Sequence, residues 1–523
     1  MPLERIEENF EGPSWSNRIF FYFCLFSFLL IIFLLVFIGL AAIYPDFAIP
    51  NGPHYNTTEL RNMGFFDNER YLISALVQSL AATIALVITL SLVAVQLAAQ
   101  SYSARVIDVY KNNPDMWILL SIYIVVIFYG LGLLKVIDVG VAGINMEFTI
   151  FAAYFLGFFA FVCLVPYILN TLDLLKPSTV IEISAEKITK DNVLTALNNN
   201  EVIDEIDPVQ PIIDIINSAL EKNDYETVRN GLKAITKSTV SILKKSHFEK
   251  GEGKAFSRYI IDAVNNIAIF AIRKENENST LSVIHNLEII GTKAAEQKLE
   301  AAALEAAKAL GNVGAKAAEQ KLEAATWKTA KALENVGTET VKQKLELASR
   351  LAAIALGNVG TKAAEQKFEG TTWEVAKALG NIGTKAAEQK LEAATWEVAK
   401  ALGNVGTKAV EEKLELESEE TIDSLRDVGT KATEQKFELA ASEATKALGN
   451  IGIKAAEQKH EITAWKATNA LEIVGIKTVE QKLEIGKTEA YVTFIELLKR
   501  VEDNKWDKLS NNIKEILEKI KYV

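Results

Sequence analysis

Residues with chemically useful side chains are few and scattered along this chain of 523 residues. The two cysteines, Cys24 and Cys163, lie inside long apolar segments, where a disulfide framework or a metal site is implausible. The histidines stand singly, with no second nitrogen or sulfur ligand at metal-binding spacing: His54, His247, His285 and His460. Without a nucleophile–base pair, a metal set or a phosphate loop, we expect no enzymatic activity and no cofactor.

A short glycine-containing stretch, Gly251-Glu-Gly-Lys254, superficially resembles a phosphate-binding loop. It lacks the G-x-x-x-x-G-K-[ST] spacing and no strand precedes it, so we interpret it as a surface turn.

Polar residues inside or beside apolar segments are the remaining candidates for chemistry, because placing them in lipid is costly. The candidate membrane polar site consists of Gln78, Gln96, Arg105, Lys135 and Asp138. Lys135 and Asp138 are three residues apart, so on a continued helix they share a face and can pair. Two interpretations stay open. The pair is either an interfacial ion pair with a snorkelling lysine or part of a gate or permeation path.

The distribution of charge divides the chain in two. Residues 1–175 contain 20 charged residues and residues 176–523 contain 103. The first part has four segments that are apolar over the ~20 residues needed to cross a bilayer. They are 19–43, 72–98, 116–134 and 148–169. We therefore predict a four-helix transmembrane domain over residues 1–175. The net charge of −11 and the sequence pI of about 5.3 argue against nucleic-acid binding.

Basic residues near the spans predict the orientation of the domain. If the N-terminus is inside, the inner segments carry seven Lys or Arg residues and the outer segments carry three. We expect a multi-pass protein of the cell membrane with both termini in the cytoplasm.

The end of the second span is the most distinctive membrane segment. Residues 90–106 read L-S-L-V-A-V-Q-L-A-A-Q-S-Y-S-A-R-V. This segment resembles the prokaryotic four-span membrane proteins of domain-of-unknown-function family 2254, in which an L-S-L-V-A-x-Q-L-A segment is followed by a Ser-x-Arg end. Lys135 falls where such proteins tend to carry a basic residue, whereas Ala104 stands where proline is common. The resemblance covers about residues 1–220 and implies a topology but no activity.

Beyond a connector of helices over residues 176–286, the chain repeats itself every 23 residues. Nine units cover residues 287–483, and their commonest sequence is G-T-K-A-A-E-Q-K-L-E-A-A-T-W-E-V-A-K-A-L-G-N-V. The apolar spacing predicts one helix of about 19 residues per unit, broken at G-N-V-G-T. Consecutive antiparallel helices would stack as 46-residue hairpins.

The ending A-K-A-L-G-N-[IV]-G is also similar to short HEAT-like repeats, which place two helices in about thirty residues. One or two helices per unit therefore stay open. Either arrangement is an all-α, α-α superhelical solenoid, and residues 484–523 would cap its open end.

One position in the unit varies between tryptophan, arginine and glutamate, which is unusual for a deep core position. Its four tryptophans are the candidate partner-binding residues: Trp327, Trp373, Trp396 and Trp465. They form a stripe on one surface, as interface anchors do, or they shield neighbouring helices. Both interpretations stay open.

These features favour a membrane-anchored scaffold whose cytoplasmic solenoid binds a protein partner. The alternative is an oligomeric ion channel or transporter that the solenoid regulates; four spans hardly line a wide pore, so this alternative needs a homo-oligomer. A membrane enzyme ranks last.

Overall fold

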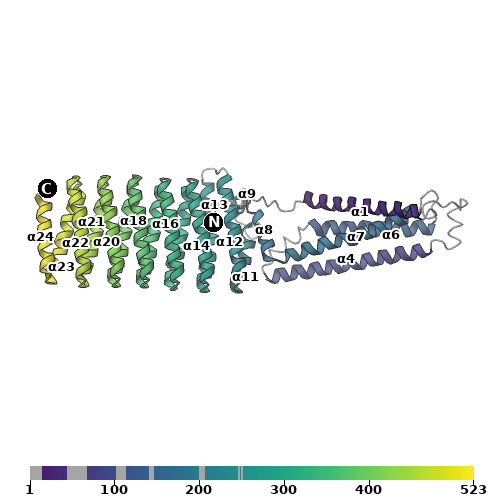
Figure 1. The fold of residues 1–523 in the computed structure, drawn as a ribbon, viewed down its shortest axis with the longest axis horizontal. Coiled ribbons are helices and arrows are strands. Elements are labelled where there is room, and N and C mark those ends of the chain that lie inside the picture. The colour runs from purple at the N-terminus through teal and green to yellow at the C-terminus, as the bar shows by residue number, and fades with distance from the viewer. Residues whose placement is uncertain are drawn as a thin grey trace. The chain divides into compact units, whose positions relative to one another are not determined.

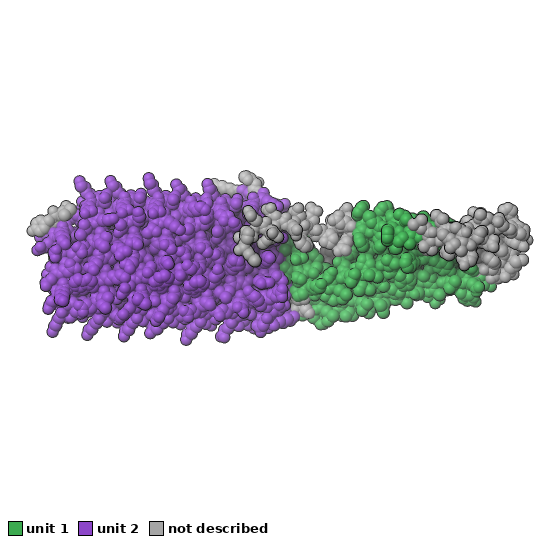
Figure 2. Space-filling view, viewed as in Figure 1, with its two compact units in different colours: residues 1–186 green, residues 187–523 purple. Residues whose placement is uncertain are grey.

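The computed structural model describes residues 15–43, 67–101, 114–139, 146–198, 207–245, 248 and 251–522. The described residues form helices joined by turns, and none of them is in a strand. The chain divides into two compact units, residues 1–186 and 187–523, which Figure 2 shows in different colours. The predicted all-α fold class is confirmed.

The first unit contains four long apolar helices, and each of them includes one predicted span. They are α1 (Trp15–Ile43), α4 (Asp67–Ser101), α6 (Pro114–Val139) and α7 (Met146–Leu174). A short helix, α8 (Pro177–Glu186), follows. The predicted four apolar helices are thus present (Figure 1), and by length and composition α4, α6 and α7 could cross a membrane.

The helices of the first unit pack on one another through a narrow apolar face. Leu80, Leu119 and Tyr123 form the centre of one buried cluster with Phe159 of α7. Gly130 allows a close approach, because a methyl group there would lie 2.5 Å from the side chain of Val77. The remaining faces expose many large apolar side chains, as expected of helices that contact lipid.

The second unit begins with helices α9 (Lys190–Asn198), α11 (Gln210–Glu221), α12 (Tyr225–Lys245) and α13 (Glu252–Arg273). By length and composition alone α13 could also cross a membrane. However, α13 carries five charged residues and is markedly less apolar than α4, α6 and α7. It also packs against α11, α14 and α15. We therefore assign it to the helical array.

One helix of twenty residues forms each 23-residue unit, which answers the question that the sequence left open. Figure 1 shows these helices standing in a row. They are α14 (Glu277–Glu296), α15 (Glu300–Glu319), α16 (Glu323–Lys342), α17 (Glu346–Glu365), α18 (Glu369–Glu388), α19 (Glu392–Glu411), α20 (Glu415–Glu434), α21 (Glu438–Glu457), α22 (Glu461–Glu480) and α23 (Glu484–Asp503), followed by the shorter α24 (Asp507–Tyr522).

The predicted position of the break between helices is wrong. The helices run through G-N-V-G-T and end at the Gln-Lys-Leu segment instead. At the first such turn Lys298 adopts φ 56°, and its N–H bonds to the Ala295 carbonyl while that of Leu299 bonds to the Ala294 carbonyl. This is the Schellman arrangement, with lysine where glycine is usual. A lysine in the left-handed region also lies between each later pair of helices, up to Lys505.

The glycines of G-N-V-G-T lie inside the helices because their neighbours leave no room for a side chain. A methyl group at Gly314 would lie 2.7 Å from Thr329 of the next helix and 2.7 Å from Val359 of the helix after it. Packing therefore overrides the low helix propensity of glycine.

Each helix contacts the next one and the one after it, so the array has two layers. The even layer contains α14, α16, α18, α20 and α22; the odd layer contains α15, α17, α19, α21 and α23. Hydrogen bonds connect neighbours within a layer, such as Asn335 Nδ2 to Glu288 Oε1 at 2.6 Å. The stacking unit is thus the predicted 46-residue pair of helices.

The two layers differ in the side chains at their contacts. In the odd layer glycine recurs at 46-residue steps, at Gly311, Gly357, Gly403 and Gly449, and each lies against a small residue of the next odd helix. The equivalent residues of the even layer are Glu334, Gly380, Arg426 and Glu472. The contacts within the odd layer are accordingly the most extensive in the array, and the even layer has the bulkier surface.

Candidate functional site

The predicted polar residues of the membrane helices are not gathered into one site. Gln78 and Gln96 are exposed on α4, and Lys135 is exposed on α6. The Gln78 amide makes a long 3.4 Å hydrogen bond to Ser74 of its own helix. Neither Gln96 nor Lys135 has a hydrogen bond or an ion pair with any residue that the structure describes. Arg105 and the side chain of Asp138 lie outside the described residues.

Other polar residues, which the sequence did not single out, join the membrane helices. Asn170 of α7 donates a 2.6 Å hydrogen bond to the carboxylate of Asp115, which is buried in the first turn of α6. The hydroxyl groups of Ser91 and Tyr167 also lie in hydrogen-bonding contact. The sequence shows Asp115 as an acidic residue next to Pro114, but its hydrogen-bonding partner Asn170 is 55 residues away and cannot be identified from spacing.

The four candidate tryptophans do not share one surface. Trp327, Trp373 and Trp465 belong to α16, α18 and α22 of the even layer, whereas Trp396 belongs to α19 of the odd layer. Trp396 is half-buried and packs beside Phe437, Ala440 and Ala441 at the start of α21. Trp373 is 36% exposed, with the Lys377 ammonium group 4.8 Å from its ring centre.

Trp373 lies in a surface groove of about 420 Å³ that crosses α18, α20 and α22. We call it the acidic groove. Its apolar lining residues are Trp373 and Leu416, the latter 73% exposed. The other lining residues are Glu369, Gly370, Glu417, Glu419, Glu420, Asp423 and Lys466. Five carboxylates therefore surround two apolar side chains, with one ammonium group among them.

Ion pairs occupy part of this charge. The Lys466 ammonium group lies 3.1 Å from Glu419 and 2.8 Å from Asp423. Burial lowers the pKa of Lys466, but the hydrogen bonds to Asp423 and Glu419 outweigh burial and raise it. Among the described residues no ion pair is found for Glu369 or Glu420, so both remain available to a ligand.

Glu417 is the buried carboxyl group among the residues that line the groove. Burial, together with the charge of nearby Glu369, raises the pKa of Glu417. The acidic groove nevertheless keeps a negative field at neutral pH, because its other carboxylates lie closer to solvent.

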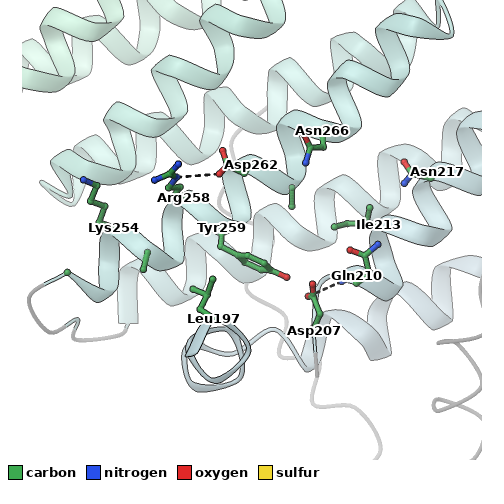
Figure 3. Close-up of a pocket in the computed structure, with 13 residues that line it drawn as sticks. Leu197, Asp207, Gln210, Ile213, Asn217, Lys254, Arg258, Tyr259, Asp262 and Asn266 are labelled. Carbon is green, nitrogen blue, oxygen red and sulfur yellow. Dashed lines mark hydrogen bonds and ion pairs between the residues drawn. The ribbon is translucent and has the colours of Figure 1, made fainter. Parts of the chain in front are cut away.

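A larger cavity of about 890 Å³ lies between α9, α11 and α13 (Figure 3). Its polar lining is mixed in charge. The Arg258 guanidinium group pairs with Asp262 at 3.5 Å, and the Asp207 carboxylate accepts the N–H groups of Val209 and Gln210 at the start of α11. In Figure 3 the Tyr259 hydroxyl points toward Asp207. Gly251, at φ 100°, immediately precedes α13, and residues 252–254 belong to the first turn of that helix, so the prediction of a surface turn over residues 251–254 is wrong for all but Gly251.

Neither concave site has the ligands of a metal centre. No group of three or more His, Cys, Asp or Glu side chains suited to a metal ion occurs in the described parts of the chain. The acidic groove combines two exposed apolar side chains with negative charge.

A comparison with known protein families supports the prediction of a membrane domain in the first part of the chain. Residues 17–243 match the family model described as "Predicted membrane protein (DUF2254)", so the resemblance drawn from the second span is confirmed. The match shows a multi-pass membrane protein and assigns it no activity.

No curated protein matches the chain. Among solved structures, a "Circular tandem repeat protein with novel repeat topology and enhanced subunit contact surfaces" is similar at 18% identity and a TM-score of 0.37, covering 77% of this chain and 96% of that chain.

Proposed function

Because residues 17–243 match a family of predicted membrane proteins, we propose that this chain is a membrane-anchored scaffold. Its spans fix it in the cell membrane with both termini in the cytoplasm. Its helical array binds a protein partner through the acidic groove.

The observation that carries this proposal is the position of Trp373 and Leu416 among carboxylates. Leu416 is 73% exposed, which leaves its apolar surface in water at the second position of α20. Exposed aromatic side chains with adjacent apolar surface are frequent anchors of interfaces. The surrounding charge then selects the partner.

The chemistry of the groove fits a basic amphipathic segment of another protein. Its apolar side chains would contact Trp373 and Leu416, and its Lys or Arg side chains would pair with Glu369 and Glu420. Attraction between exposed charges is screened by salt, so capture of the partner should weaken as the salt concentration rises.

Trp396 does not belong to this surface. It packs against α21 in the odd layer, where glycine and alanine contacts hold the helices close together. In this proposal Trp396 shields neighbouring helices, whereas Trp373 contacts the partner.

The experiment is co-purification from native membranes with the tagged full-length protein. We expect a partner that is retained by the wild type and lost from the double variant Glu369→Lys/Glu420→Lys. Glu443→Lys is the matched control, since Glu443 is the equivalent residue of Glu420 one unit later and lies in the odd layer.

Equal loss from the control variant, or full retention by the double variant, would contradict the proposal. A Trp373→Ala variant adds a test that leaves charge unchanged, and we expect it to lower the recovery of the same partner.

A further inference from the structure

The outward face of α4 carries a regular row of small and polar residues. Of the helices of the first unit, α4 packs against α6 and α7, and its residues Ile73, Val77, Leu80 and Val87 are buried there. On the opposite side of the same helix, a row of exposed residues recurs at alternating steps of four and three residues. We call this row the α4 seam, and it comprises Gln78, Ala82, Ala85, Thr89, Leu92 and Gln96, all of them exposed.

The composition of the seam differs from that of other lipid-facing surfaces. Many exposed residues of α6 and α7 are bulky, including Ile124, Val125, Phe128 and Phe158, although Ser121 and Gly132 of α6 are exposed too. The seam instead presents two alanines, a threonine, two amides and one leucine, with larger side chains such as Leu86 and Ile88 beside it. Small residues with polar groups are typical of the contacts between membrane helices, because they allow close approach and hydrogen bonding.

Among the residues that the structure describes, the two amides find little hydrogen bonding. Thr89 satisfies its hydroxyl by donating to the Ala85 carbonyl at 2.9 Å. Gln78 makes only the 3.4 Å contact with Ser74, and no bond is found for Gln96 among the described residues. The hydrocarbon core of the bilayer offers no donor or acceptor, so exposing the Gln78 amide to it is costly, whereas Gln96 lies near the end of the predicted span 72–98.

The spacing indicates that the missing partner is a helix. Residues that recur at alternating steps of three and four lie along one line of contact in a left-handed helix pair. α1 packs on α6 and α7, so it does not fill this role.

We take the partner helix to be α4 of a second copy of the chain, because all copies have the same orientation in the bilayer. Two copies with the same topology meet about an axis normal to the membrane, so their α4 helices run parallel and each seam residue faces its own counterpart. A charged residue would repel its counterpart. An amide both donates and accepts, so Gln78 and Gln96 are complementary to themselves.

We propose that two copies of this protein associate in the membrane through the α4 seam, with Gln78 and Gln96 hydrogen-bonded to the same residues of the second copy. This inference does not depend on the proposed function of the array.

The test is disulfide cross-linking of the full-length protein in native membranes. The background variant lacks both cysteines (Cys24→Ala and Cys163→Ala), and single cysteines are introduced at Ala82 or Ala85. Ile88→Cys on α4 and Val125→Cys on α6 are exposed controls that lie off the seam. We expect oxidation to link the seam variants into a species of twice the 57.7 kDa chain mass, several times more efficiently than the controls.

Equal linking at all four positions, linking at none, or an adduct with a protein of another mass would overturn the proposal. A second measurement avoids the cysteine-free background. Replacing both amides by leucine, Gln78→Leu with Gln96→Leu, suits lipid and should preserve the fold. We expect dissociation on dilution in liposomes to become roughly three- to tenfold easier, and unchanged or tighter association would overturn the amide pairing.

Discussion

A methyl group added to Gly357 would lie 2.8 Å from the Cβ of Ala401, 44 residues further along the chain. The Cα of Ala401 would be only 3.3 Å away, so the obstacle includes backbone and cannot rotate aside. The same relationship joins Gly311 to Ala355 and Gly403 to Ala447. This close approach sets the spacing of the odd layer.

Gly357→Ala should therefore destabilise the array, by about 1–3 kcal/mol, because the helices must move apart to admit the methyl group. Gly370→Ala is the matched control, since nothing lies within 4 Å of a methyl group there. We expect the control to be neutral or to stabilise by up to about 0.5 kcal/mol through helix propensity. Thermal unfolding of the full-length protein in detergent, followed by circular dichroism, measures both. Equal effects of the two substitutions would contradict the packing role.

The turns between the helices lead to a second prediction, because their lysines adopt the left-handed backbone conformation that favours glycine. Lys390 has φ 63° in the turn between α18 and α19. Lys390→Gly should stabilise the protein by about 0.5–1 kcal/mol, since the left-handed conformation costs glycine nothing. Lys385→Gly, inside the last turns of α18, should destabilise it by up to about 1 kcal/mol. Chemical denaturation of both variants checks the opposite signs, and destabilisation by Lys390→Gly would contradict the assignment of the turn.

The sequence was sufficient for the membrane helices and the period of the array, but not for the position of the turns. Continuous apolar runs and a 23-residue repeat depend on local composition. The turn at Gln-Lys-Leu lacks glycine, while Gly314, which resembles a helix terminator, is required by Thr329 and Val359. Such contacts reach 15 and 45 residues along the chain, so spacing within one unit cannot reveal them.

The same limit applies to the candidate site. Four tryptophans at one position of the unit suggest one stripe, yet alternate helices face opposite sides of a two-layer array. Trp373 and Trp396 are therefore separated by their layers. The acidic groove also depends on Leu416 and Glu417 of α20, the next helix of the even layer after α18. Nothing in the sequence around these two residues marks them as part of a site.

The layers predict different consequences for loss of two tryptophans. Trp396→Ala should destabilise the protein by about 1–3 kcal/mol, because it removes contacts with Phe437 and Ala440. Trp373→Ala should change stability by less than about 1 kcal/mol, since its side chain is more exposed. Calorimetry of the two variants measures the difference. A larger loss for Trp373→Ala would show that this residue serves packing rather than recognition.

Glu288 predicts a pH dependence of stability. Burial would raise its pKa, but the contact with His285 at 3.6 Å, the hydrogen bond from Asn335 and the charge of Lys328 outweigh burial and lower the pKa of Glu288 to about 2. Its carboxylate thus stabilises the fold above its ordinary value of 4.5, and this contribution is lost as the pH falls toward 2.

Glu288→Gln should remove this part of the acid sensitivity. We expect the variant to be less stable than the wild type at pH 7, by on the order of 2 kcal/mol, and the difference to shrink between pH 4.5 and pH 2. Unfolding midpoints measured across this range check the sign. A difference that stays constant with pH would contradict the role of the Glu288 carboxylate.

The most direct test of the scaffold proposal is site-specific photo-cross-linking in living cells. A photoreactive amino acid replaces Trp373 in the full-length protein, and in a second variant it replaces Trp396. We expect a cross-linked adduct with one defined protein from position 373, weakened when Glu369 and Glu420 are both changed to lysine, and no such adduct from position 396. Absence of any adduct at position 373, or the same adduct at both positions, would contradict recognition through the acidic groove.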